Sequence, residues 1–337
     1  MAQTRSKKPE FYQDFMREDF FPDTNKIIIK YQESSNFWIF KTGKRVYKVK
    51  KKAATQSSIA LDELFCKEAV ATINIHSPSL ETELMCVVRD GDQYTLQKKD
   101  KKIGLYTVIA MNQLLDRHFL DTIIEKGKVS EKMIGQIVDF LYRFHEQTSK
   151  SNSKEDGTPE HLNALLQDLF YQSKKYLGVT ISQAIIDMIL HPLEKYLVNH
   201  RKLFLRRIKK GFIKKTHGCF IPGKINIQKD TVVALSRSTD PLKNKHTDVA
   251  ADLADLIVEL NQAELGDLSA YLIKRYSRIS GDKEIKQILP FYRAIKCLTI
   301  GNKHSVAMQN STGNVAAVHQ SRATRYYEQI IDIMHKL

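Results

Sequence analysis

The pattern of apolar and polar positions changes character near residue 112. Before this point, short runs with the alternation typical of β-strands lie at 27–30, 37–40, 45–49, 85–89, 94–97 and 106–111. Residues 58–75 instead carry apolar positions at spacings of three and four, which predicts a helix that ends before Pro78. This part is therefore predicted to be a small antiparallel sheet with one helix.

Beyond residue 113 the periodic segments are mostly helical. Helices are predicted at 119–126, 131–146, 160–177, 181–197, 246–264, 267–279, 284–300 and 321–336. The polar stretch 148–159 is predicted to be a loop, and a short strand region at 219–233 interrupts the helices. The pattern predicts an α+β fold with two lobes: an N-terminal extension (1–25), a β-rich N-lobe (26–112) and a larger helical C-lobe (113–337).

Composition narrows the class of protein. The chain of 337 residues is 42% hydrophobic and 27% charged, which is ordinary for a soluble globular protein. No stretch approaches the about 18 apolar residues of a membrane helix, and the basic, polar N-terminus lacks the apolar segment of a secretory signal. Four cysteines lie far apart, without metal-ligand or redox spacing: Cys66, Cys86, Cys219 and Cys297. We expect reduced thiols and a cytoplasmic protein.

Residues 33–51 read E-S-S-N-F-W-I-F-K-T-G-K-R-V-Y-K-V-K-K, two strands joined by a Lys-Thr-Gly-Lys turn. This segment resembles, without a gap, the pattern E-T-H-I-S-W-V-F-L-T-G-x-x-A-Y-K-I-K-K of a bacterial phosphotransferase group similar to aminoglycoside phosphotransferases and choline kinases. Further segments resemble that family in the same order: 65–68, 106–111, 120–127, 144–145, 248–254 and 291–294. The resemblance covers about residues 26–300 and implies a bilobal protein-kinase-like fold.

The resemblance also implies roles for residues of the N-lobe. Lys48 matches the family's strand lysine, which steadies nucleotide phosphates, and Glu68 matches the helix acid that holds this lysine. Met111 closes the strand that would flank an adenine, although a methionine there is also ordinary core. These three residues are the nucleotide-binding candidates of the N-lobe.

The catalytic loop departs from the family. Its pattern H-G-D-L-H-x-x-N is met by His217-Gly218-Cys219-Phe220-Ile221-Pro222-Gly223-Lys224, within a degenerate loop region at 217–236. Cys219 stands at the catalytic Asp position, Lys224 at the metal-binding Asn, and Ser236 at the second metal-binding Asp. A thiol is a poor Mg²⁺ ligand and an ammonium repels the ion. We predict no catalytic residues, no metal and no small-molecule substrate: a pseudokinase that acts as a binding, scaffold or regulatory subunit.

Other interpretations stay open. Asp230 or Asp240 could supply a carboxylate in a shifted register, which would leave an atypical ATP-dependent phosphotransferase. Lys224 could neutralise phosphate charge itself, so ATP or another nucleotide without Mg²⁺ is the one cofactor considered.

A net charge of +15 adds a further feature. Residues 201–215 contain eight cations and no acid, interleaved with apolar residues that suggest one buried face: Arg201, Lys202, Arg206, Arg207, Lys209, Lys210, Lys214 and Lys215. Such a run favours an anionic partner, namely an acidic protein or RNA. A nucleic-acid-binding protein on a kinase-like scaffold is therefore a third hypothesis, although no RNA-binding motif is recognisable.

Overall fold

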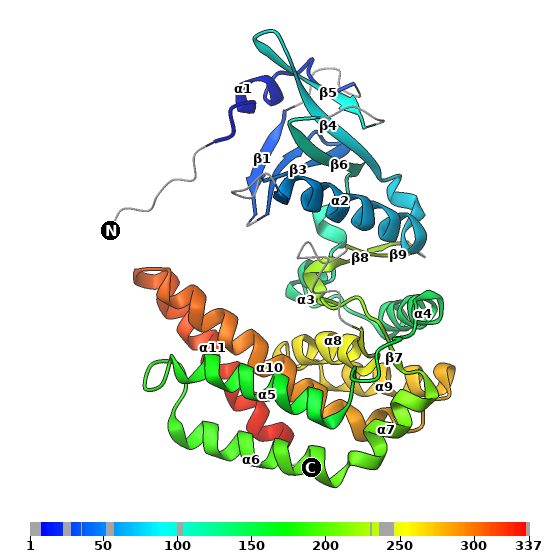
Figure 1. Ribbon diagram of the computed structural model, residues 1–337, viewed down its shortest axis with the longest axis vertical. Coiled ribbons are helices and arrows are strands. Elements are labelled where there is room, and N and C mark those ends of the chain that lie inside the picture. The colour runs from blue at the N-terminus through cyan, green and yellow to red at the C-terminus, as the bar shows by residue number, and fades with distance from the viewer. Residues whose placement is uncertain are drawn as a thin grey trace. The chain divides into compact units, whose positions relative to one another are not determined.

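The chain folds into two compact units (Figure 1). The computed structural model describes residues 8–22, 28–34, 36–51, 57–99, 104–229, 231–235 and 246–334. The first unit contains the described residues up to His118 together with 233–235, and the second contains the rest. The division therefore passes through strand β9 (Thr231–Ala234).

A six-stranded antiparallel sheet forms the centre of the first unit. Its order is β1-β2-β3-β6-β4-β5, with the strands β1 (Lys30–Glu33), β2 (Phe37–Lys41), β3 (Arg45–Lys50), β4 (Glu83–Asp90), β5 (Gln93–Lys98) and β6 (Tyr106–Asn112). The β2–β3 turn contains Gly43 at φ 87°, a left-handed conformation that glycine adopts without strain. The strands predicted from the alternating pattern are thus confirmed, except that β1 begins at Lys30 instead of ending there.

The two faces of the sheet are covered by different segments. Alternate residues of the central strands, such as Tyr47 and Val108, share one buried cluster with Phe11, Phe15 and Phe21 from the N-terminus. Short helix α1 (Tyr12–Phe15) lies in this segment, so residues 8–22, expected to form an extension, are part of the core. Helix α2 (Ser57–His76) covers the opposite face. There the ring of Phe65 packs near the ring of Phe37, with 6.1 Å between the ring centroids.

The second unit is mainly helical. Its helices are α3 (Leu120–Glu125), α4 (Glu131–Gln147), α5 (Pro159–Lys174), α6 (Gln183–Asn199), α7 (Arg201–Lys210), α8 (Ala250–Gln262), α9 (Gly266–Ser280), α10 (Ile285–Gln309) and α11 (Gly313–Met334). Strands β7 (Ile213–Lys215) and β10 (His246–Asp248) pair antiparallel, and β8 (Ile225–Gln228) precedes β9. Together with the sheet of the first unit, this confirms the predicted α+β class.

The two last helices are longer than the pattern predicts. Helix α10 was expected to end at residue 300, yet it continues to Gln309, and α11 begins at Gly313 instead of 321. Polar residues obscure the periodicity here because Asn302 and Ser305 are buried and bond to the Tyr327 hydroxyl of α11, at 2.9 and 3.2 Å. The absence of a side chain at Gly301 leaves room for the Tyr327 ring, since a Cβ on residue 301 would lie 2.5 Å from that ring.

A buried arginine joins three segments of the second unit. Arg207 of α7 is fully buried, and its guanidinium donates to Asp248 at 2.5 and 2.8 Å and to both oxygens of Asp282 at 2.9 Å. The ring of Phe212 lies 4.3 Å from the guanidinium. Arg207 therefore belongs to the core, and this corrects its place among the cations predicted to face a partner.

Within the described residues, no helix combines the length and the apolar character that crossing a bilayer requires.

Removal of the Arg207 charge should strongly destabilise the second unit. Arg207→Met would keep most of the side-chain volume but leave Asp248 and Asp282 buried without their cation, which should lower the free energy of unfolding by about 3–5 kcal/mol. The neighbouring Arg206 is half-exposed and pairs with Glu284 at 2.9 Å, so Arg206→Met should change it by less than about 1 kcal/mol. Urea denaturation of both variants measures the difference; equal losses would contradict a structural role for Arg207.

Candidate functional site

The loop 217–224 is held by two aspartates of helix α8. The backbone N–H groups of His217 and Gly218 donate to the two carboxylate oxygens of Asp252, at 2.7 and 2.8 Å. The N–H of Phe220 donates to Asp255 at 2.8 Å. Gly218 has φ 70°, a left-handed conformation that favours glycine. The matched His-Gly therefore has a structural explanation: it forms the start of an anchored loop.

A buried histidine completes the anchor. His145 of α4 places Nε2 3.1 Å from Asp252 and Nδ1 2.7 Å from the hydroxyl of Tyr276. Both ring nitrogens of His145 therefore have a hydrogen-bond partner. Burial opposes ionisation of Asp252, but the bonds from His145 and from the loop outweigh it, and the pKa of Asp252 is lowered. Asp252 is thus a charged anchor inside the second unit.

His217 itself is surrounded by apolar rings. The rings of Phe144 and Phe220 lie 5.9 and 5.4 Å from it, and neither of its ring nitrogens has a hydrogen-bond partner in the described part of the chain. Burial lowers the pKa of His217, and this effect outweighs the opposing influence of Asp252 and Asp255. The imidazole is therefore neutral and serves to pack the loop.

Cys219, at the position of the family's catalytic carboxylate, is half-buried. Behind the loop, Lys296 of α10 forms a 2.5 Å ion pair with Asp255. Burial disfavours the Lys296 ammonium, but Asp255 more than compensates, with Cys219 contributing, so the pKa of Lys296 is raised. The cation that interacts with Cys219 is thus already paired with Asp255, an anchor of the loop.

Lys224 ends the 3₁₀ helix Pro222–Lys224 and is half-buried. Ser236, Asp230 and Asp240, on which the predicted second metal position and its possible substitutes depend, lie outside the described residues. Cys219 and Lys224 do not suit Mg²⁺, which prefers oxygen ligands, and within the ranges described no three histidines, cysteines or carboxylates gather as ligands for a metal. No step through a bound metal can be derived from these residues.

The N-lobe candidates lie in the first unit. Lys48 of β3 and Glu68 of α2 are half-buried, and Met111 of β6 is buried as an ordinary core residue would be. An ion pair joins β3 to α2 beside these candidates, between Lys50 and Asp62 at 3.0 Å. A role for the three candidates in nucleotide binding stays a prediction.

The basic run divides into three groups. Arg207 and Lys214 serve the interior, and Lys214 donates to the carbonyl of His145 at 2.6 Å and to Glu146 at 3.0 Å. Three more cations pair with surface acids: Arg201 with Glu160, and Arg206 and Lys210 with Glu284. Lys202, Lys209 and Lys215 form no ion pair with any described residue and are exposed or half-buried. The surface that is free to meet a partner is smaller than the run suggests.

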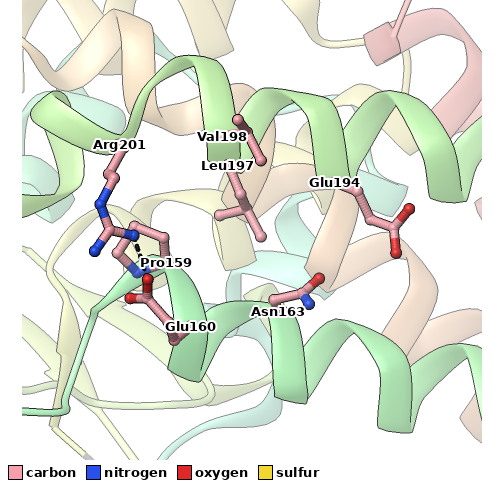
Figure 2. A pocket seen from close by; sticks show the side chains of 7 residues that line it. All are labelled: Pro159, Glu160, Asn163, Glu194, Leu197, Val198 and Arg201. Atoms are coloured by element: carbon pink, nitrogen blue, oxygen red, sulfur yellow. Dashed lines mark hydrogen bonds and ion pairs between the residues drawn. The ribbon is translucent and has the colours of Figure 1, made fainter.

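Arg201 closes one end of a groove between α5 and α6. Figure 2 shows its guanidinium directed at Glu160, beside Pro159, with Leu197 and Val198 on the neighbouring helix. The groove encloses about 270 Å³. Arg201, the first residue of the basic run, is thus paired with a surface acid of the same chain.

Sequence reasoning missed the contribution of α10 and α11. Lys296 and Glu259 lie behind the loop and Tyr326 donates to Glu259 at 3.1 Å, but they are far from the loop in sequence and belong to no local motif. Asp252 lies in segment 248–254, which the sequence marked only through the resemblance.

Known proteins match this chain in structure but not in sequence. No family model matches it, and no curated protein matches it. A thermostable mutant of aminoglycoside phosphotransferase APH(4)-Ia is similar with a TM-score of 0.54 at 11% identity, over 94% of this chain and 98% of that one. A choline/ethanolamine kinase family protein from Mesorhizobium loti gives 0.51 at 12%, over 92% of each chain. Choline kinase from Cryptosporidium parvum gives 0.52 at 11%, over 96% of each.

Identities this low establish the fold alone. The chain has the α+β, protein-kinase-like fold of aminoglycoside phosphotransferases and choline kinases, which confirms the fold that the sequence motifs implied.

The lowered pKa of His217 predicts a specific acid sensitivity. The folded chain binds a proton at His217 less readily than the unfolded chain, whose histidine titrates at about 6.5, so this contribution to stability is complete above that pH and falls below it. From about pH 7.5 to about pH 5.5, unfolding should become easier by up to about 1.4 kcal/mol through this residue. In His217→Gln, the difference in the free energy of unfolding between the two pH values should be smaller by this amount, and urea denaturation measures it.

His191→Gln is the matched control, because His191 is exposed on α6. It should keep the pH difference of the unmodified chain. The same difference in His217→Gln as in the unmodified chain would show that His217 is not protected from protons.

Proposed function

We propose that this chain is a pseudokinase that acts as a binding or scaffold subunit. In this proposal its loop 217–224 keeps the backbone conformation of a phosphotransferase loop but lacks the side chains that phosphoryl transfer needs. One observation carries the proposal: the loop backbone is anchored by Asp252 and Asp255, while the side chains it presents are the thiol of Cys219 and the ammonium of Lys224. An anchored loop preserves a fold, whereas proton transfer and metal binding need carboxylates.

The substitutions at the loop affect both requirements of phosphoryl transfer. A thiol replaces the carboxylate that would orient the acceptor hydroxyl, and an ammonium replaces an oxygen ligand of the metal. Loss of one such group commonly lowers kcat by a factor of about 10² or more, and residues that act as a unit lose nearly all activity together. Lys224 can still neutralise a phosphate, so nucleotide binding without Mg²⁺ is compatible with the proposal, with Lys48, Glu68 and Met111 as its further candidates.

The absence of disulfides among the four cysteines supports a reducing compartment such as the cytoplasm. Cys66, Cys86 and Cys297 are buried and Cys219 is half-buried, and none of the four forms a disulfide.

The chain should not turn over ATP. With Mg²⁺ or Mn²⁺, ADP formation by the purified protein should stay at the level found for Lys48→Ala, because the loop supplies neither the acceptor carboxylate nor the metal ligand. Coupled detection of ADP measures this. Turnover that Lys48→Ala abolishes would identify an active, atypical phosphotransferase and end the proposal.

Binding is separated from turnover in the same preparation. Thermal stabilisation by ATP in EDTA reports metal-free binding, and Lys224→Ala should reduce it if the ammonium replaces the ion.

The basic helix α7 offers a surface for an anionic partner, either an acidic protein or RNA. Lys202 and Lys209 are seven residues apart and thus share one helical face, opposite to the buried Leu203 and Phe204. Because neither lysine is committed to an acid of the described chain, both charges are available to a partner.

Removing these two lysines should weaken binding to polyanions more than removing two positive charges elsewhere on the chain. Lys202→Ala/Lys209→Ala should elute from heparin at lower salt and reduce the salt dependence of RNA binding by roughly two phosphate contacts. The matched double variant Lys274→Ala/Lys283→Ala removes two exposed lysines elsewhere and should change retention less. Equal effects of the two pairs would attribute retention to overall charge and exclude this face.

A further inference from the structure

A surface cavity of the second unit lies beside the anchored loop and has no part in the proposal above. It encloses about 400 Å³ and is bordered by α3, α8, α10 and α11. Pro222 of the loop lines it. Asp121 lines it too and lies close to the loop, because a Cβ built on Gly223 would be 3.0 Å from its carboxylate. Cavities of this size hold small molecules.

Opposite charges line this cavity from different helices. Arg322 and Arg325, three residues apart on α11, project from one helical face, and Asp121 and Glu125, four residues apart on α3, project from another. All four side chains belong to exposed residues. No ion pair joins any of them to another residue of the described chain, so two cations and two anions border one cavity without neutralising each other.

The titratable groups between these walls include His304 and Glu259. His304 stacks on Tyr326 with ring centroids 5.8 Å apart, and its Nδ1 lies 3.0 Å from that of His319. Burial, with His319 and nearby cations, lowers the pKa of His304 to about 4, so its ring is neutral near pH 7. Burial also raises the pKa of Glu259, which accepts a hydrogen bond from Tyr326. The exposed charged groups of the cavity are therefore the two arginines and the two outer carboxylates.

A ligand of a single charge sign would satisfy only one wall. A simple amine would leave the two guanidiniums without a partner, and a simple anion would leave the two carboxylates without one. A molecule that carries both signs can form charge-assisted hydrogen bonds with both. The bodies of Pro222 and Tyr326 provide apolar contact for a short carbon chain between its ends.

We propose that this cavity binds a small zwitterion, whose carboxylate or phosphate is held by Arg322 and Arg325 and whose ammonium is held by Asp121 and Glu125. The ligand also contacts Pro222 and thereby the loop. The site requires only binding, so it exists whether or not the chain transfers phosphate.

Calorimetric titration of the full chain with two homologous series tests this. The probes are ω-amino acids from β-alanine to 6-aminohexanoate and ω-aminoalkyl phosphates of the same lengths, each compared with the alkylamine and the alkyl carboxylate or phosphate of equal length. At least one zwitterion should bind at least about tenfold more tightly than both of its single-charge homologues, since each of these loses one set of charged hydrogen bonds. The series that binds identifies the anionic group.

Variants assign the binding to this cavity. Arg322→Gln/Arg325→Gln and Asp121→Asn/Glu125→Gln should each weaken the best probe by about tenfold or more. These residues are exposed, so folding should be retained, and circular dichroism checks it. Arg278→Gln, at an exposed arginine of α9 outside the cavity, should leave the affinity unchanged.

Three results would overturn the proposal: no zwitterion of either series binds up to about 10 mM, a single-charge homologue binds as tightly as the zwitterion, or the cavity variants bind as well as Arg278→Gln.

Discussion

The second unit depends on one carboxylate. Asp252 accepts hydrogen bonds from two consecutive N–H groups of the loop and from His145, and the side chains of Asp252 and His145 are buried. A buried carboxylate is stable only when its charge is satisfied, and here the loop backbone and a histidine satisfy it. The loop conformation and the packing of α4 against α8 are thereby coupled. The anchor needs no particular side chain at Cys219 or Lys224, so these positions can change without loss of the loop.

That independence explains how a phosphotransferase fold can persist with an altered loop. The groups that shape the loop lie on α8 and α4 and act on its backbone, whereas the chemistry that the loop can offer is set by its own side chains. A backbone N–H donates its hydrogen bond whatever side chain its residue carries. The conformation of the loop and the chemistry of its side chains are therefore separable.

Charge is distributed by a similar division of roles. The run 201–215 contains eight cations, yet Arg207 neutralises two buried aspartates and Lys214 binds a backbone carbonyl and Glu146. Burying an arginine is tolerable only where carboxylates surround it, and Asp248 and Asp282 come from segments 41 and 75 residues away along the chain. A basic run is therefore a poor measure of a basic surface until the acids that meet it are located.

Local pattern and motif were sufficient for the fold class and for most of the elements. The alternation in residues 37–50 and 83–112 and the helical spacing after residue 119 depend on which face of each element is buried, and that is written in neighbouring residues. The altered loop positions were also readable, because a motif places them by spacing. Tertiary structure alone decided that residues 8–22 complete the sheet's core, that Arg207 is internal, and that α10 continues through Asn302 and Ser305. It also brought Asp121 and Arg322 to one cavity across 201 residues. Each of these depends on partners distant in the chain, and no local periodicity records which distant residue will satisfy a buried charge or share a cavity.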